Sequence, residues 1–175
     1  MNIIDLIKYL PIIVFTICSR LNSMTDAAWQ NAFILGGIFA AIVVAIQFDK
    51  KVIFDRIMLG VNLFLSVGAI AFLGSFYSLL YFYGTYKGAA LLMCTGLVGI
   101  ATTLYTDVGF IGADVEGKAH LKRIYSYQLL VINGFFIMWA LMTNCYDVLI
   151  SVVVPFIALR TAYERFVKQL QHIKE

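Results

Sequence analysis

The sequence predicts an all-α, polytopic integral membrane protein with six transmembrane helices and both termini in the cytoplasm. First, 62% of its 175 residues are hydrophobic and only 13% are charged, and the mean hydropathy is +0.89. A soluble domain is typically about half apolar and about a quarter charged, so this excess indicates a lipid solvent. Second, long apolar segments recur along the chain. Third, lysine and arginine gather on one side of those segments.

A helix needs about 20 mostly apolar residues to cross the hydrocarbon core of a bilayer. Six segments reach or approach this length: about 4–20, 29–48, 53–74, 86–105, 125–143 and 146–163. The first is the least regular because Asp5, Lys8 and Pro11 shorten its apolar part, so an interfacial helix is the alternative there. It has neither a basic start nor a small-x-small cleavage site, which favours a retained helix over a signal peptide.

The boundaries of these segments give the predicted domain organisation. Residues 1–163 form the six-helix transmembrane domain, and residues 164–175 form a short cytoplasmic tail. The tail carries mixed charges, which is typical of a solvated end, with a partner-binding helix as the alternative.

The basic residues orient the spans. Lysine and arginine are enriched in cytoplasmic loops, and eleven of the thirteen lie on the side that holds both termini, whereas Arg20 and Lys87 lie on the other. Tyr77, Tyr81, Tyr83 and Tyr86 gather at that second side, as an aromatic belt would. We expect the membrane to be the bacterial inner, cytoplasmic membrane.

Small residues recur at helical spacing in two spans. They let helix backbones approach closely in lipid, where no hydrophobic force drives helices together. This pattern predicts packing within the chain, with a homodimer seam as the alternative. The residues are Ala28, Ala32, Gly36 and Ala40 in the second span, and Gly96 and Gly99 in the fourth.

Polar residues inside the spans are few, and such residues usually mark a substrate pathway in a membrane protein. The candidates are Asn62, Ser66, Asn133, Ser151 and Pro155, the last of which frees the carbonyl of Ser151 from helical hydrogen bonding. They would line a small neutral cavity, and interhelical hydrogen bonding is the plainer account. No acidic or basic residue lies at the centre of the five regular spans, which argues against a proton-coupled pump.

Enzymatic and cofactor chemistry lacks the residues it needs. Cys18, Cys94 and Cys145 are widely spaced, and His120 and His172 lie in polar segments. This arrangement disfavours a zinc site, a haem site or a cysteine–histidine nucleophile. We predict a protein that is not an enzyme and has no cofactor or metal.

One loop resembles part of a phosphate-binding P-loop, namely GADVEGKA at residues 112–119. A P-loop follows a strand and places serine or threonine after its lysine, whereas Ala119 stands there and a membrane span precedes the loop. We therefore expect no nucleotide and no nucleic acid among the partners. Lys118, Lys122 and Arg123 are interpreted as topology anchors that keep this loop in the cytoplasm.

Several motifs are shared with a known family. They are LIKYLPIIVF at 6–15, Phe48-Asp49-Lys50, Gly68-Ala69-Ile70-Ala71-Phe72-Leu73, and the series Ser126, Phe135, Phe136, Ile137 and Asn144-Cys145-Tyr146. In these motifs and in length the chain resembles the intracellular septation protein A family of small bacterial inner-membrane proteins. It lacks that family's Lys-Pro after the fourth span and its tryptophan at the start of the fifth. The resemblance implies a role in envelope maintenance or cell division through protein partners.

The leading functional prediction is a small non-enzymatic inner-membrane protein that acts through helix–helix and protein-partner contacts. Its partners would be the lipid bilayer and either another membrane protein or a second copy of itself. The chain would then act as an oligomer or as a subunit of a larger membrane assembly. The alternative is a small-solute transporter or channel with a neutral polar pathway between the third, fifth and sixth spans.

Overall fold

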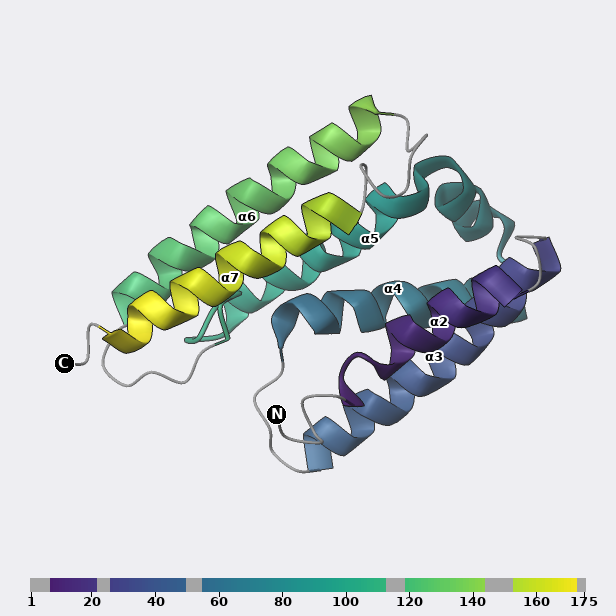
Figure 1. Cartoon of the computed structure of the whole chain (residues 1–175), viewed down its shortest axis with the longest axis horizontal. Helices are drawn as coiled ribbons and strands as arrows, with labels where there is room; N and C mark the ends of the chain where they lie inside the picture. Colours follow the sequence, from purple (N-terminus) through teal and green to yellow (C-terminus); the bar gives the residue numbers. More distant parts are fainter. Residues whose placement is uncertain (1–6, 22–25, 50–54, 113–118, 144–152, 173–175) are drawn as a thin grey trace. The chain divides into compact units, whose positions relative to one another are not determined.

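The computed structural model describes residues 7–21, 26–49, 55–112, 119–143 and 153–172. Helices make up most of these residues, and none of them lies in a strand. The predicted all-α fold class is therefore confirmed. The helices are α2 Leu10–Leu21, α3 Asp26–Asp49, α4 Arg56–Leu73, α5 Tyr77–Tyr105, α6 Ala119–Met142 and α7 Val154–His172 (Figure 1).

Four of the described helices are long and apolar enough to cross a membrane. They cover Ala27–Asp49, Arg56–Leu73, Gly88–Tyr105 and Ala119–Met142, in agreement with the second to fifth predicted spans. Helix α2 has a shorter apolar part, Leu10–Ser19, which spans about 15 Å at 1.5 Å per residue. The predicted sixth span begins among residues 144–152, outside the described part of the chain. Six spans and the orientation of the termini therefore stay predictions.

The chain divides into two compact units, and helices α4 and α5 contribute to both. The first unit contains Met1–Val52 and Val61–Thr85, and the second contains Ile53–Gly60 and Tyr86–Glu175. Each unit has its own interior.

In the first unit, α2 and α3 form an antiparallel hairpin, and α4 packs against α3 (Figure 1). Gly37 marks a close approach between α3 and α4, because a Cβ there would lie 2.5 Å from the Ala69 Cβ and 3.1 Å from the carbonyl oxygen of Leu65. Gly36 faces α2, where its Cβ would meet the Cβ of Phe15 at 3.3 Å. Because glycine has no side chain at these two positions, the helices of this unit can pack closely together.

Aromatic side chains fill the rest of the first unit. The ring of Phe33 is central, and four ring centroids lie 4.9 to 5.5 Å from its own, those of Phe15, Phe64, Phe72 and Tyr83. Gly68 leaves space for Phe33, because a Cβ at Gly68 would lie 2.3 Å from that ring. Such clusters favour tilted and edge-to-face pairs, which add to the gain from burial.

Tyr83 belongs to this interior, and its interpretation as part of an exposed aromatic belt was wrong. It is buried, and its hydroxyl donates a hydrogen bond to the carbonyl oxygen of Phe64 at 2.7 Å. Tyr77 and Tyr81 are exposed. They lie one helical turn apart, whereas Tyr83 is two positions further on and faces the opposite side of α5.

The turn between α4 and α5 caps the C-terminal end of α4. The N–H of Phe76 donates to the carbonyl of Ala71 at 3.0 Å, and the N–H of Ser75 donates to Phe72 at 3.4 Å. This is the Schellman pattern, which needs a left-handed residue after the helix. Ser75 takes that conformation, with φ at 52°.

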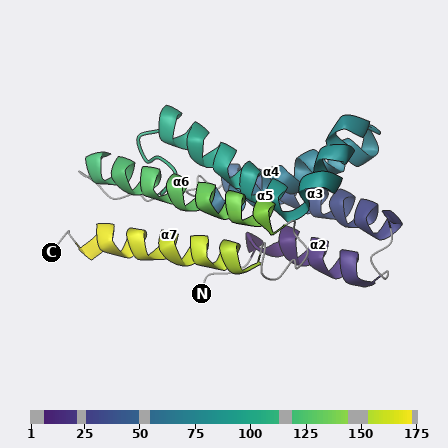
Figure 2. The same cartoon turned by 90° about the horizontal axis from the view of Figure 1, so that it is seen from above.

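In the second unit, α6 and α7 run antiparallel and side by side in both views (Figures 1 and 2). Their shared interior contains the fully buried Ile57, Phe110, Ile111, Leu129, Leu159 and Leu170. The rings of Tyr125 on α6 and Phe166 on α7 stack with centroids 4.9 Å apart. Helix α7 is amphipathic, and its apolar face is the one that packs.

Helix α7 continues without a break past residue 163, where the predicted transmembrane domain ends. Leu170 is fully buried, while Arg165 and Lys168 are exposed. One face of residues 164–172 therefore packs against the unit and the other face is solvated. The domain boundary at 163 stays a prediction.

The outward faces of two span-length helices are apolar. Leu35, Ile38 and Ile42 are exposed on α3, and Val131 and Phe135 are exposed on α6. A contiguous apolar surface of this kind marks an interaction with membrane or protein, which agrees with a membrane protein whose helices face lipid.

Candidate functional site

A polar contact joins the start of α4 to the middle of α7. Asp55 immediately precedes α4, where the first backbone N–H groups of a helix have no partner inside it. Asp55 Oδ1 accepts hydrogen bonds from the N–H groups of Ile57 and Met58, at 3.2 and 3.3 Å. The carboxylate therefore caps α4, as aspartate commonly does.

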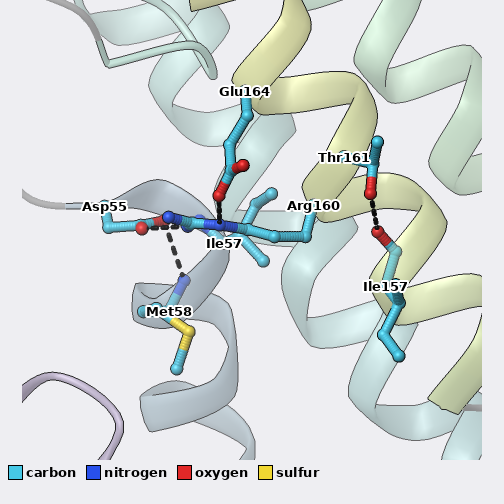
Figure 3. A network of polar contacts seen from close by, with 7 residues as sticks. All are labelled: Asp55, Ile57, Met58, Ile157, Arg160, Thr161 and Glu164. Carbon is cyan, nitrogen blue, oxygen red and sulfur yellow. Dashed lines mark hydrogen bonds and ion pairs between the residues drawn. The ribbon is translucent and has the colours of Figure 1, made fainter. Parts of the chain in front are cut away.

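The other carboxylate oxygen of Asp55 pairs with Arg160 of α7 (Figure 3). Arg160 Nη1 donates to Asp55 Oδ2, and Arg160 Nε donates to Glu164 Oε1 at 2.9 Å. The guanidinium also lies 5.3 Å from the ring centroid of Tyr163. The side chains of Arg160 and Asp55 are only 20% and 9% exposed, so solvent screens this pair weakly. We call Asp55, Arg160 and Glu164 the α4–α7 ion cluster.

Arg56 adds a second cation next to Asp55 in the chain. Its Nε is buried and has no hydrogen-bond partner among the described residues. Together with the α4–α7 ion cluster it gives two acidic and two basic side chains, so the formal charges balance. Because the Asp55 carboxylate is held by an arginine and by backbone N–H groups, this arrangement is suited to fixing α7 against α4.

Asn133 lies in the contact between α6 and α5 in the second unit and is buried, with 1% of its surface exposed. Its Nδ2 donates to the carbonyl oxygen of Leu92 at 3.1 Å. Gly96 makes this contact possible, because a Cβ there would lie 2.6 Å from Asn133 Nδ2. Asn133 Oδ1 is buried without a hydrogen-bond partner among the described residues.

The other predicted pathway residues are distributed over both units. Asn62 and Ser66 belong to the first unit, whereas Asn133 and Pro155 belong to the second. Asn62 is buried and its Oδ1, like that of Asn133, has no partner in the described part of the chain. Ser66 is half-buried and Pro155 is buried. Ser151 lies outside the described residues.

The small residues predicted to pack helices all face an interior. Ala28, Ala32, Gly36 and Ala40 are buried along one face of α3. On α5, Gly96 contacts Asn133, and a Cβ at Gly99 would lie 2.9 Å from both Leu130 and Phe110. A third close approach was not predicted: a Cβ at Gly60 of α4 would lie 2.5 Å from the Cα of Thr95 on α5.

The connection after α5 folds back onto α6. Gly109 and Gly112 have φ of 61° and 60°, which glycine adopts without strain. The N–H of Gly109 donates to Thr106, and the N–H of Ile111 donates to Ser126 Oγ at 3.3 Å. Residues 106–112 therefore form a turn that is hydrogen-bonded both within itself and to α6.

The predicted cytoplasmic-loop residues differ in exposure. Lys118 lies outside the described residues, and Arg123 is exposed on α6. Lys122 is only 8% exposed. The role of all three as topology anchors stays a prediction.

Within the described ranges, no group of three or more His, Cys, Asp or Glu side chains is arranged to hold a metal ion. Sequence reasoning missed the pairing of Asp55 with Arg160, because the two residues lie in different segments of the chain. The available signal was an aspartate directly before an apolar helix, which is typical of a helix cap.

Comparison with known proteins returned no match to a family model, to a curated protein or to a solved structure.

Proposed function

We propose that this chain is a six-span inner-membrane protein with both termini in the cytoplasm. The four span-length helices support the second to fifth of these spans, and residues 4–20 and 146–163 would supply the first and the sixth. The distribution of lysine and arginine supports the orientation. Asp55 and Arg160, which pair in the structure, would both lie at the cytoplasmic side.

Its function, in this proposal, is contact with other membrane proteins and not catalysis. This proposal rests on the hydrogen bonds that the polar side chains of the spans make. Asn133 ties α6 to α5 at the gap left by Gly96. Thr95, Thr102 and Thr103 donate to carbonyls of their own helix. The Asn133 amide thus joins two helices, and the threonine hydroxyls are satisfied within their own helix, so these groups leave little polar surface for a substrate.

The partner would be a second membrane protein or another copy of the chain, which meets the apolar outer faces of α3 or α6. The resemblance to the intracellular septation protein A family supports envelope maintenance or cell division as the setting. An aromatic and branched face such as that of Val131 and Phe135 offers a surface that another helix could pack on.

Photo-crosslinking tests this function. A photoreactive phenylalanine analogue at Val131 or Phe135, both exposed on α6, should give a cross-linked product of defined mass in native membranes. The same analogue at Leu129, which is fully buried, is the control and should give no product between chains. Absence of any product from Val131, Phe135 and matching positions on α3 would contradict the proposal.

A small-solute transporter is the second candidate, and one observation favours it. Asn62 and Asn133 each keep a buried Oδ1 without a hydrogen-bond partner among the described residues, and buried polar atoms are usually paired. A pathway for a neutral solute would use such acceptors.

Flux through reconstituted vesicles separates the two candidates. If the chain acts through contacts, uptake of urea or glycerol should stay at the level of protein-free vesicles. Asn133→Leu would then change only stability, by about 1 kcal/mol, as interhelical hydrogen bonds in membranes typically do. Uptake by the wild type that Asn133→Leu abolishes, and that the neighbouring Gly134→Ala keeps, would favour the transporter instead.

A further inference from the structure

Basic side chains, and no acidic ones, lie at the start of α6. The N-terminus of a helix carries the positive end of its macrodipole, so acidic residues or bound anions stabilise it. The first turn of α6 contains no acidic residue. It holds His120 and Lys122, and Arg123 follows directly. The first N–H groups of the helix also have no partner within it. The first turn of α6 therefore holds no negative charge that could offset the positive end of the helix dipole.

Lys122 gives a second, independent observation. It is 8% exposed, and neither an ion pair nor a hydrogen bond of its side chain occurs within the described part of the chain. Lysine is almost never buried to this extent unless it is paired. Its ammonium group therefore has three donors available to a ligand.

The position of Lys122 follows from its neighbours. Ser126 lies one turn later on the same face of α6, and it accepts the hydrogen bond from Ile111. A Cβ at Gly109 would lie 2.4 Å from Ser126 Oγ and 3.9 Å from the Lys122 carbonyl oxygen. This face therefore packs against the turn at 106–112. Helical side chains tilt toward the N-terminus of their helix, so the Lys122 side chain is directed toward the first N–H groups of α6, which have no partner within the helix.

We propose that Lys122 and the first-turn N–H groups of α6 bind a phosphate group. Phosphate oxygens accept several charge-assisted hydrogen bonds, and a helix N-terminus is suited to receive them. Exposed side chains on α6 change from Phe135 and Val131 to Arg123 and His120 toward this end, so the site lies where apolar surface gives way to polar surface. A phospholipid headgroup and inorganic phosphate share the chemistry that this site would recognise.

The experiment uses the full chain purified in a maltoside detergent, which contains no phosphate. One arm titrates inorganic phosphate against chloride at constant ionic strength and follows the thermal unfolding midpoint. The other arm adds phosphatidylglycerol or a phosphate-free galactosyl diacylglycerol and counts bound lipid by native mass spectrometry. The variants are Lys122→Gln, Lys122→Arg and, as the matched control, Arg123→Gln.

We expect wild type to bind in at least one arm, and Lys122→Gln to weaken that binding about tenfold, as the loss of one charged hydrogen bond would. Lys122→Arg and Arg123→Gln should keep it, which also shows that the fold tolerates change here. Binding of inorganic phosphate alone would identify a free anion, and binding of phosphatidylglycerol but not the galactolipid would identify a headgroup.

Equal binding by wild type and Lys122→Gln, or no binding in either arm, would overturn the proposal. Asp114 and Glu116 lie outside the described residues, and a double variant Asp114→Asn/Glu116→Gln addresses them. Phosphate binding that appeared only in this double variant would mean that the chain's own carboxylates occupy the site, and would also overturn it.

Discussion

Gly60→Leu should lower the free energy of unfolding by about 3 kcal/mol, the upper end of what overpacking typically costs. A Cβ at Gly60 would lie 2.5 Å from the Cα, 2.7 Å from the Oγ1 and 2.9 Å from the Cβ of Thr95. Because the nearest of these atoms belongs to the backbone, no side-chain rotation relieves the clash, and α4 and α5 must separate. Unfolding in mixed micelles, followed by circular dichroism as denaturing detergent is added, measures the change.

The matched control for this prediction is Gly134→Ala. Gly134 lies within a helix of the same unit, and a Cβ there would meet nothing within 4 Å. Alanine is preferred to glycine in a helix by about 0.5–1 kcal/mol, so this variant should be neutral or slightly more stable. A Gly60→Leu protein as stable as Gly134→Ala would show that α4 and α5 do not cross at Thr95.

Neutralising either partner of the ion pair between Asp55 and Arg160 should cost about 3 kcal/mol. Each single variant, Asp55→Asn or Arg160→Gln, leaves the other charge in a place that is at most 20% exposed. Asparagine caps helices as well as aspartate does, so Asp55→Asn isolates the ion pair from the cap on α4. Asp55→Ala should cost about 1 kcal/mol more, because it removes the cap as well.

The double variant Asp55→Asn/Arg160→Gln tests whether the two charges act on each other. Its destabilisation should be clearly smaller than the sum of the two single effects, as expected for directly interacting residues. Glu164→Gln is the control, since Glu164 is 53% exposed and pairs within one helix, where such pairs contribute about 0.3–0.5 kcal/mol. Additive single effects would mean that Asp55 and Arg160 are not partners.

Composition and apolar run length were enough to predict the all-α class and four helices able to span a membrane. Both depend on local properties, because a membrane helix satisfies its backbone within one segment. The periodicity of small residues likewise singled out Ala28 to Ala40 on α3, and all four are buried. The spacing alone could not say which helix they meet.

What the sequence could not give depends on contacts between distant segments. Asp55 and Arg160 are 105 positions apart, and nothing local to either marks the other as its partner. Tyr83 differs from Tyr81 only in the face of α5 on which it lies, so both were assigned to the membrane surface. Lys122 was taken together with Arg123, yet the first is buried and the second is exposed, because successive residues of a helix point about 100° apart around its axis.

The ion pair between α4 and α7 also has a consequence for how the protein is made. Translation proceeds at about 5–20 residues per second, so Asp55 is added to the chain roughly 5–20 s before Arg160. During that interval Asp55 can cap α4, but its charge has no arginine from α7. Helix α7 therefore completes a contact that α4 prepares earlier in synthesis, and a chain that stops short of residue 160 would lack the α7 arginine that pairs with Asp55.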